Sequence, residues 1–464
     1  MAVSDLDLSR SESGPSRSES GPSGSGPEGG ARRPALRRCT AVPADEFAES
    51  IWGRQASLSR AADLAPSGPE AAVGSRRAAR SDAFGDLFSL AAADELLSEH
   101  GLRTPFLRVA KDGRTLPAAR FTSAGGVGAG ISDQVSDVRL TRLFAEGASI
   151  VLQALHRTHP PVIDFAQALS ADLGHPVQVN AYLTPPQAQG FSAHYDVHDV
   201  FVLQIAGEKR WQIHAPVHPA PLRDQPWTDH RAAVEAAARE EPLIDEVLRP
   251  GDALYLPRGF LHAATALGET TAHLTFGVHV WTRRHLLEQL LAAVADDEEL
   301  RGSLPLGVDV TDPSALRAEL ARTADKFASL LPKVEAARVA EGMVGPALDA
   351  GKAAAVGPLA QARAAEQAGP QTRLRWRPAL RVVVRRDSDQ LVVRTPDGEV
   401  RLPVAAGLAL DRLQAGEVLT AADLMPAGLL VDLAAAAPDP AHCRAADPLD
   451  LARTLIRDCL VVPA

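Results

Sequence analysis

The stretch Phe191-Ser-Ala-His-Tyr-Asp-Val-His-Asp-Val-Phe201 places His194 and Asp196 two residues apart. On a β-strand, side chains two apart point to the same side, so one imidazole and one carboxylate can share a metal ion. His198 and Asp199 follow directly and stay open as rival ligands, because His198 has the same strand parity as His194.

A second stretch, Arg249-Pro-Gly-Asp-Ala-Leu-Tyr-Leu-Pro-Arg-Gly-Phe-Leu-His262, would supply the third ligand. Pro250-Gly-Asp252 and Pro257-Arg-Gly259 are turn sequences on either side of an apolar strand, Ala253 to Leu256. We expect the second turn to deliver His262 into the interior of a barrel, beside the first pair of ligands.

His194, Asp196 and His262 then make a set of two histidines and one carboxylate. This is the facial triad of non-haem Fe(II) oxygenases, which leaves one face of the octahedron open for a co-substrate and O2. A structural zinc site would be closed and usually contains cysteine. The three cysteines of this chain, Cys39, Cys443 and Cys459, are widely separated. The sequence therefore predicts catalytic iron on these three residues.

The region from Val177 to Trp281 consists of short alternating apolar runs that are interrupted by Gly and Pro. This spacing is typical of an antiparallel barrel or sandwich. The predicted strands are Val177–Leu183, His198–Ile205, Trp211–His214, Ala253–Leu256 and Ala272–Trp281.

The flanking sequence predicts mainly helices. Before the barrel we expect helices over 91–99, 145–156 and 162–173, and a strand over 105–109. After it, apolar residues three and four apart predict helices over 285–294 and 316–331, the second capped by Asp312 or Ser314. From residue 373 onward we expect strands over 382–384 and 391–402, turning at 397–398, a cap pair formed by Thr420 and Asp423, and a last helix over 449–459.

The first residues are rich in Ser, Gly, Pro and Glu, and the heptapeptide Ser-Arg-Ser-Glu-Ser-Gly-Pro occurs twice. Such a segment buries too little apolar surface to fold, so we expect a disordered tail. A net charge of -10 provides no global basic field for nucleic acid, so nucleic acid is not an expected partner. Neither a signal peptide nor an apolar membrane span is recognisable, which favours a cytoplasmic protein without membrane association.

Several blocks in this order resemble a known family. Gly251, Pro257, Gly259 and His262 match the spacing of the second motif of the cupin superfamily, without its trailing Asn. More closely, residues 180–279 resemble the JmjC-type ribosomal oxygenases, which are Fe(II)- and 2-oxoglutarate-dependent protein hydroxylases. The matching blocks are Asn180-x-Tyr182, His194-Tyr-Asp196, Phe201-Val-Leu-Gln204, Gly207-Glu-Lys209-x-Trp211, Pro250-Gly-Asp252, Pro257-Arg-Gly259-x-x-His262 and His273-Leu-Thr275.

The resemblance implies an α+β protein with a double-stranded β-helix (jelly-roll or cupin) core and flanking helices. It also implies a helical dimerisation region and a C-terminal winged-helix-like domain. We therefore predict a disordered tail (1–43), a JmjC/cupin catalytic domain (44–284), a helical dimerisation or linker region (285–372) and a winged-helix-like domain (373–464). A homodimer is the expected assembly.

The resemblance also implies that Lys209 pairs with the distal carboxylate of 2-oxoglutarate, the co-substrate. From the sequence, a hairpin turning at Gly207 would place Lys209 beside the iron strand, although an exposed lysine in the turn remains an alternative. A lysine aimed into a barrel is costly unless an anion pairs with it. Asn180, Tyr182 and Thr275 are further candidates for hydrogen bonds to the co-substrate. Gly277 stands where relatives can carry Ser, which puts one such contact in doubt.

The predicted function is the hydroxylation of a protein side chain, with a ribosomal protein as the candidate target and O2 as oxidant. The alternatives are a hydroxylase of a biosynthetic peptide or small molecule, and a non-enzymatic cupin with a structural metal. Demethylation of histone-like tails is a chemical variant. A DNA-binding C-terminal domain is a third class, based on the arginines Arg373, Arg375, Arg377, Arg381, Arg385 and Arg386.

Overall fold

A computed structural model describes residues 33–64, 84–111, 113–188, 192–388, 390–425 and 447–464. The repeated heptapeptide of the predicted disordered tail lies outside these residues. Up to residue 173 the elements are α1 (Leu36–Cys39), α2 (Ala44–Glu46), the π-helical turn η1 (Phe47–Ile51), β1 (Ser57–Ser59), α3 (Leu90–Ser98), β2 (Leu107–Lys111), β3 (Arg114–Thr115), η2 (Ala118–Arg120), β4 (Thr122–Ser123), β5 (Gln134–Val135), α4 (Asp137–Ala145), β6 (Ser149–Leu152), α5 (Leu155–Thr158) and α6 (Pro160–Leu173).

The segment that was predicted to form the barrel follows. It contains β7 (Val177–Thr184), β8 (Asp199–His214), η3 (Trp227–His230), α7 (Arg231–Ala237), β9 (Ile244–Leu248), β10 (Ala253–Leu256) and β11 (Leu261–Val278). These strands join one nine-stranded antiparallel sheet in the order β1-β10-β8-β11-β7-β6-β2-β3, with β9 paired to β8 off this path. The predicted antiparallel architecture is confirmed, and the sheet is consistent with a JmjC or cupin fold.

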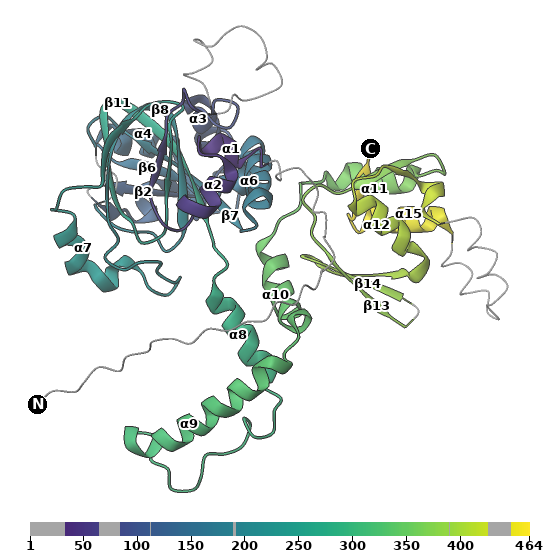
Figure 1. The fold of residues 1–464 in the computed structure, drawn as a ribbon. Coiled ribbons are helices and arrows are strands. Elements are labelled where there is room, and N and C mark those ends of the chain that lie inside the picture. Colours follow the sequence, from purple (N-terminus) through teal and green to yellow (C-terminus); the bar gives the residue numbers. More distant parts are fainter. Residues whose placement is uncertain (1–32, 65–83, 112, 189–191, 389, 426–446) are drawn as a thin grey trace, which may run out of the picture. The chain divides into compact units, whose positions relative to one another are not determined.

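The two long strands β8 and β11 are neighbours in the middle of the sheet (Figure 1). The first half of β8 pairs with β10, and its second half pairs with β9. β11 pairs with β8 along nearly its whole length and with β7 through its second half. Side chains from β2, β6, β7, β8 and β11 therefore line a common interior.

The hairpin predicted at Gly207 is absent, because β8 continues through this residue. Gly207 has φ +63°, and a Cβ atom there would lie 2.5 Å from the carbonyl oxygen of Thr270. The register of β11 jumps from Leu267 to Ala272 opposite this point. A glycine inside a strand often marks such a bulge, where another backbone approaches closely. Lys209 thus lies within one long strand rather than after a turn.

Helices cover the outer face of the sheet (Figure 1). Leu36 of α1, Phe47 of η1, Leu96 of α3 and Phe165 of α6 share one buried apolar core with strand residues such as Val179. The predicted helices over 91–99 and 162–173 are confirmed by α3 and α6. This core fixes which face of the strands points into the cavity.

The predicted tail extended to residue 43, but the described part of it is folded. Leu36 and Cys39 are each 1% exposed. The backbone N–H groups of Ala35 and Leu36 donate to the carboxylate of Asp172 at 2.8 and 3.0 Å. The composition of the first residues concealed these apolar positions, so the predicted boundary lies too far along the chain.

The helix predicted over 145–156 is also wrong. Residues 149–152 form strand β6, which is buried along its length between β2 and β7, with the short helices α4 and α5 on either side. A short apolar run can form either a buried strand or part of a buried helix, and periodicity does not distinguish the two. Pairing on both edges, a long-range feature, selects the strand.

The remaining elements are α8 (Arg283–Val294), α9 (Pro313–Leu330), η4 (Leu331–Lys333), α10 (Ala336–Ala350), α11 (Pro358–Gln367), β12 (Arg373–Trp376), β13 (Val383–Asp387), β14 (Gln390–Thr395), β15 (Gly398–Pro403), η5 (Val404–Ala406), α12 (Gly407–Gln414), β16 (Leu419–Thr420), η6 (Ala421–Leu424), α15 (Pro448–Arg457) and β17 (Val461–Pro463). The strands form two three-stranded sheets, β16-β12-β17 and β13-β14-β15. A separate apolar core joins residues of these sheets to α11, α12 and α15.

Several local predictions for this part are confirmed. Asp312 caps α9 by accepting from the N–H of Ser314, and Thr420 and Asp423 form a reciprocal capping box. The β14–β15 hairpin pairs Thr395 with Gly398, so its turn begins one residue earlier than predicted. Within the described ranges, no helix combines the length and apolar character needed to cross a membrane.

Candidate metal centre and the cavity around it

Alternate side chains of strand β7 face the apolar core and the cavity. Val179 and Ala181 are fully buried in the core beneath the helices. Successive side chains of a strand point to opposite faces, so Asn180, Tyr182 and Thr184 project from the other face. These three residues line the interior enclosed by β8 and β11.

The loop before β8 and the start of β11 bring the predicted ligands together. His194 and His262 exchange two backbone hydrogen bonds, of 3.2 and 2.9 Å. The carbonyl of Asp196 accepts from the N–H of Gly259 at 3.0 Å, so the predicted turn anchors the acidic ligand. His194 and Asp196 lie in an irregular segment with one isolated bridge, and the prediction of a regular strand there is wrong.

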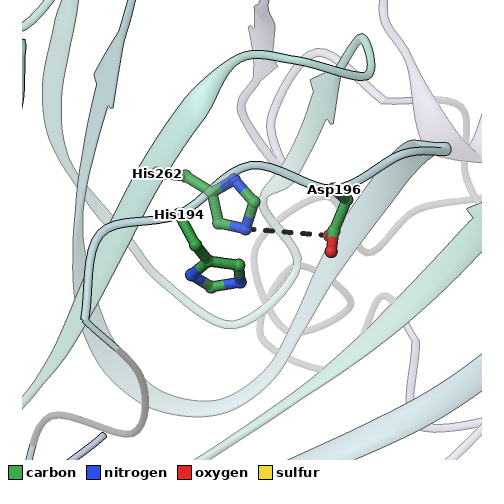
Figure 2. A group of neighbouring side chains, drawn as sticks. All are labelled: His194, Asp196 and His262. Carbon is green, nitrogen blue, oxygen red and sulfur yellow. Dashed lines mark ion pairs between the residues drawn. The ribbon is translucent and has the colours of Figure 1, made fainter. Parts of the chain in front are cut away.

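The three side chains converge (Figure 2). The imidazole rings of His194 and His262 have centroids 4.4 Å apart, and Nε2 of His262 lies 3.8 Å from Oδ2 of Asp196. One nitrogen or oxygen from each of the three residues lies within 4.8 Å of the others. Among the described residues, this is the only group of three or more His, Cys, Asp or Glu side chains with that geometry.

Backbone carbonyls select the tautomers of both histidines. Nδ1 of His194 lies 2.8 Å from the carbonyl oxygen of Ser192, and Nδ1 of His262 lies 3.2 Å from that of Phe260. A carbonyl oxygen can only accept, so each Nδ1 must carry the proton. The Nε2 atoms then hold the lone pairs that a metal ion requires.

The protonation states also suit a metal ion. Burial lowers the pKa of His262 to about 4, so this imidazole is neutral at pH 7. Burial would raise the pKa of Asp196, but His198, His262, His194 and Arg108 together outweigh it, and the pKa lies below its ordinary value. Neutral imidazoles and an ionised carboxylate are the forms that bind metals.

The rival ligands are engaged elsewhere. Asp199 is fully buried and accepts from Tyr255 Oη at 2.6 Å and from the N–H of Arg258 at 3.0 Å. His198 lies beside Gln178, with 3.4 Å between Nε2 of each, and its ring centroid is 5.4 Å from that of His279. Both residues therefore belong to structural contacts next to the three converging side chains.

Lys209 occupies the closed end of a cavity of about 270 Å³, which we call the lysine chamber; Thr184, Lys209 and His273 line this end, and His194, Asp196 and His262 also line the chamber. Lys209 is 3% exposed, and its Nζ donates to Oγ1 of Thr184 at 3.2 Å. No ion pair links it to an acidic side chain among the described residues. Burial lowers its pKa to about 7.

Other buried polar atoms of residues that line the chamber lack hydrogen-bond partners within the described structure. They are Nε1 of Trp211 and Nδ1 of His273. Buried polar groups are nearly always satisfied, so this set indicates that the chamber takes a polar ligand. The lysine, these atoms and the converging side chains together fit a small dicarboxylate that reaches from Lys209 towards a metal ion.

The other predicted co-substrate residues divide between two spaces. Tyr182 and Thr275 line the lysine chamber. Asn180 lines an adjoining cavity instead, where its Oδ1 accepts from the N–H of Ala154 at 3.1 Å. Tyr182 and Thr275 also border that second cavity.

Sequence reasoning missed several residues of the site. Arg108 lies on β2, distant in sequence, and lines both cavities. His273 stacks on Tyr182 with ring centroids 4.9 Å apart and almost parallel planes, and Trp227 lies 6.4 Å from His194 between ring centroids. His273 was visible in the sequence by its parity with Thr275, whereas Arg108 and Trp227 carried no signal.

Part of this chain is similar in sequence to known proteins. Residues 157–286 match the JmjC domain family. Ribosomal oxygenase 1 of Rattus norvegicus is 29% identical over 271 residues, which cover 57% of this chain and 41% of that protein. The bifunctional lysine-specific demethylase and histidyl-hydroxylase NO66 of Drosophila erecta is 41% identical over 137 residues, or 28% of this chain and 20% of that protein. The chain thus spans less than half the length of these curated relatives.

Among solved structures, the crystal structure of the Escherichia coli ribosomal oxygenase YcfD aligns with a TM-score of 0.47 and 18% identity, and the alignment covers 91% of this chain and 98% of that one. The family match spans His194, Asp196, Lys209 and His262. Residues 157–286 of this chain therefore match a JmjC domain, and the chain is similar in sequence to the ribosomal oxygenases over part of its length.

Proposed function

We propose that this protein is an Fe(II)- and 2-oxoglutarate-dependent oxygenase that hydroxylates a side chain of another protein, with a ribosomal protein as the first candidate target. The observation that carries the proposal is the placement of His194, Asp196 and His262 beside a chamber that ends in the buried Lys209. The names of the related proteins support a protein substrate.

In this proposal the metal ion is held by Nε2 of His194, a carboxylate oxygen of Asp196 and Nε2 of His262. Iron on such a triad supplies the activation of O2, with 2-oxoglutarate ending as succinate and carbon dioxide while a C–H bond becomes C–OH. The backbone carbonyls of Ser192 and Phe260 keep both imidazoles in the required tautomer and orientation.

Lys209 would bind the distal carboxylate of 2-oxoglutarate. A buried ammonium without an acidic partner is costly, and an anionic ligand removes that cost by pairing with it. Thr184 orients Nζ through its hydroxyl group, and the ring of His273 closes the chamber against Tyr182. Lys209 and Thr184 are buried, so water would screen a charge pair at this end of the chamber less than at the surface.

A thermal-shift experiment separates this function from a non-enzymatic cupin. Mn(II) should stabilise the protein, and 2-oxoglutarate should add a further shift only when Mn(II) is present, since the two ligands bind side by side. A His194→Ala variant should lose both shifts and all 2-oxoglutarate turnover. Turnover that persists in this variant would refute the metal assignment, and a Mn(II) shift without any effect of 2-oxoglutarate would favour a structural metal.

A separate experiment would identify the protein that is hydroxylated. The His262→Ala variant, which we expect to be inactive, would be purified from the source organism together with its bound proteins. Captured proteins would then be incubated with the active enzyme and examined by mass spectrometry for the gain of one oxygen atom. Oxidation of a ribosomal protein would support the proposal, whereas turnover with small molecules or short biosynthetic peptides alone would replace it.

We also propose a homodimer that assembles through the helical region. Leu286, Leu287 and Leu291 on α8 are 45%, 56% and 58% exposed, and Leu287 and Leu291, four residues apart, lie on one helix face. α9 has 18 residues and no buried side chain within the described structure. A second copy of the chain could cover these faces, and sedimentation velocity would measure it.

We also propose domain boundaries near residues 284 and 372, and a winged-helix-like fold for residues 373–464. The separate apolar core of the C-terminal sheets and helices supports a distinct C-terminal unit. The cytoplasmic location stays a prediction from the sequence.

A further inference from the structure

Lys209 is a buried amine with little to stabilise its charged form. Its side chain is 3% exposed, and within the described structure its one hydrogen bond runs from Nζ to the neutral hydroxyl group of Thr184 at 3.2 Å. Burial penalises the ammonium but not the free amine. A desolvated lysine of this kind can act as a nucleophile, which an ammonium cannot do.

The free amine of Lys209 is abundant at neutral pH. Burial lowers the pKa of this lysine from 10.5 to about 7, so about half of the side chains are uncharged at pH 7. A lysine with the ordinary pKa of 10.5 is uncharged at that pH in only about one molecule in 3,000. Lys209 therefore presents the reactive form about a thousandfold more often than an exposed lysine.

The surroundings of Nζ fit a carboxylate-sized group attached to it. Nζ of Lys209 lies 6.0 Å from the ring centroid of Trp211, and both residues line the lysine chamber of about 270 Å³. Nε1 of Trp211 can only donate, and this buried atom has no hydrogen-bond partner within the described structure. Arg108 adds a positive charge to the same chamber. A negatively charged group on Lys209 would therefore satisfy a buried donor that is otherwise left without an acceptor.

Carbon dioxide forms such a group from a free amine. The lone pair of Nζ attacks the carbon of CO2, an N–C bond forms, and one electron pair of a C=O bond moves to oxygen. One proton then leaves the nitrogen for solvent, so Lys–NH2 and CO2 give Lys–NH–COO− and H+. The step needs no oxidant, reductant or further reactant. In the proposed function, moreover, each turnover releases CO2 beside the three converging side chains that line this chamber.

We propose that Lys209 is a reversible carbon dioxide site, which carries a carbamate when the lysine chamber holds no 2-oxoglutarate. Formation of the carbamate requires only the chamber, whereas its competition with 2-oxoglutarate rests on the proposed function. The carbamate turns a cationic anchor into an anion, so it repels the distal carboxylate that Lys209 would otherwise bind. Carbon dioxide thereby becomes a product that slows the binding of the next co-substrate.

The first test detects the carbamate on the metal-free, full-length protein. The protein is equilibrated near neutral pH with isotopically labelled bicarbonate and CO2, and carbon NMR distinguishes a carbamate from bicarbonate. An alkylating oxonium reagent then fixes the carbamate as an ester, which mass spectrometry assigns to one peptide. The wild type should carry the group on Lys209, and Lys209→Met should lose it. Lys111→Met, which removes a lysine that is 33% exposed, should keep it.

Two tryptophan variants test the hydrogen-bond donor. Trp211→Phe keeps an aromatic ring but removes the N–H, so the equilibrium constant for carbamate formation should fall about tenfold, as expected for one hydrogen bond to a charged group. Trp376→Phe is the matched control, because Nε1 of Trp376 donates to the carbonyl oxygen of Leu380 at 3.0 Å, outside the chamber. It should leave the carbamate unchanged. An undiminished carbamate in folded Trp211→Phe would overturn the part assigned to the indole N–H.

Competition experiments separate this inference from the proposed function. Zn(II) together with 2-oxoglutarate should remove the carbamate signal of the wild type. With the iron-loaded enzyme, added CO2 at constant pH should raise the KM for 2-oxoglutarate without changing kcat. Carbamate confined to the α-amino group or to exposed lysines under saturating CO2 would overturn the inference and leave the proposed function intact. A carbamate on Lys209 that persists with Zn(II) and 2-oxoglutarate would support the modification and refute the anchoring role of Lys209 in the proposed function.

Discussion

Replacing Lys209 by methionine should stabilise the protein and at the same time remove its affinity for 2-oxoglutarate. Burial lowers the pKa of Lys209 from 10.5 to about 7. The difference of 10.5 − 7 = 3.5 units, at about 1.36 kcal/mol per unit, sets an upper bound of about 5 kcal/mol on the cost of the buried charge. Methionine avoids this cost and fills most of the volume of the lysine stem.

The net gain is smaller than this bound, because the variant loses the 3.2 Å hydrogen bond from Nζ to Thr184. We expect a rise of about 2 kcal/mol in the free energy of unfolding near pH 7, which corresponds to about 4 to 8 °C in Tm for a domain of this size. Lys111→Met is the matched control, since Lys111 is 33% exposed and only 3.8 Å from Glu146 in a surface pair. It should change the stability by less than about 1 kcal/mol.

The stability difference between the Lys209→Met variant and the wild type should decrease as the pH rises. The folded protein has the lower pKa, so the unfolded chain binds more protons between pH 7 and 10.5. The cost of Lys209 is complete below pH 7 and fades as the pH rises towards 10.5. The advantage of the variant over the wild type should therefore shrink across this interval. Urea unfolding of the metal-free proteins, followed by circular dichroism at about pH 7 and about pH 10, measures it.

Binding of 2-oxoglutarate should reverse the order of stability of the wild type and the Lys209→Met variant. At about 100 times its Kd, 2-oxoglutarate should stabilise the Mn(II)-loaded wild type by about 2.7 kcal/mol and the Lys209→Met variant not at all. A variant that is less stable than the wild type at pH 7, or whose advantage is independent of pH, would refute the argument that the lysine is held at a cost. A variant that keeps the effect of 2-oxoglutarate would refute the role of Lys209 as its anchor.

Asp199→Asn should lower the free energy of unfolding by about 3 kcal/mol, because the buried carboxylate accepts hydrogen bonds from Tyr255 and a backbone N–H. Mn(II) binding should persist in this variant, and loss of Mn(II) affinity in the folded variant would show that Asp199 is a ligand. Trp227→Phe should remove part of the fluorescence quenching caused by Co(II), since the indole lies 6.4 Å from His194 between ring centroids; unchanged quenching would place the metal elsewhere. Leu287→Glu on α8 should convert the proposed dimer to monomer in sedimentation velocity, and a wild-type monomer at high concentration would contradict that assembly.

Local sequence was sufficient for many elements of the fold. The helices α6 and α9 follow from the spacing of apolar residues, and the cap at Asp312 follows from its side-chain chemistry. The strands β7 and β10 follow from alternation or from a short apolar run between turns. In each case the decisive interaction lies within a few residues along the chain, where propensity and periodicity carry the information.

The errors share a different cause. β6 was taken for helix because its identity depends on pairing with β2 and β7. Gly207 was taken for a turn because its role in β8 depends on the approach of Thr270 from β11. Both features arise from contacts between residues that are distant along the chain, and no local pattern records such contacts.

The sequence by itself predicted which three side chains come together, because two imidazoles and one carboxylate with their flanking turns form a recognisable ligand set. It also predicted that Lys209 lies beside them, although for the wrong geometric reason. Three features could be read only from the tertiary structure. They are the tautomers of His194 and His262, the hydrogen bonds that give Asp199 a structural role, and the position of Arg108 of β2 in the cavity wall. The reason is physical: the identity of a donor atom is a property of one residue, whereas its orientation, burial and charge environment are properties of the neighbours that folding brings to it.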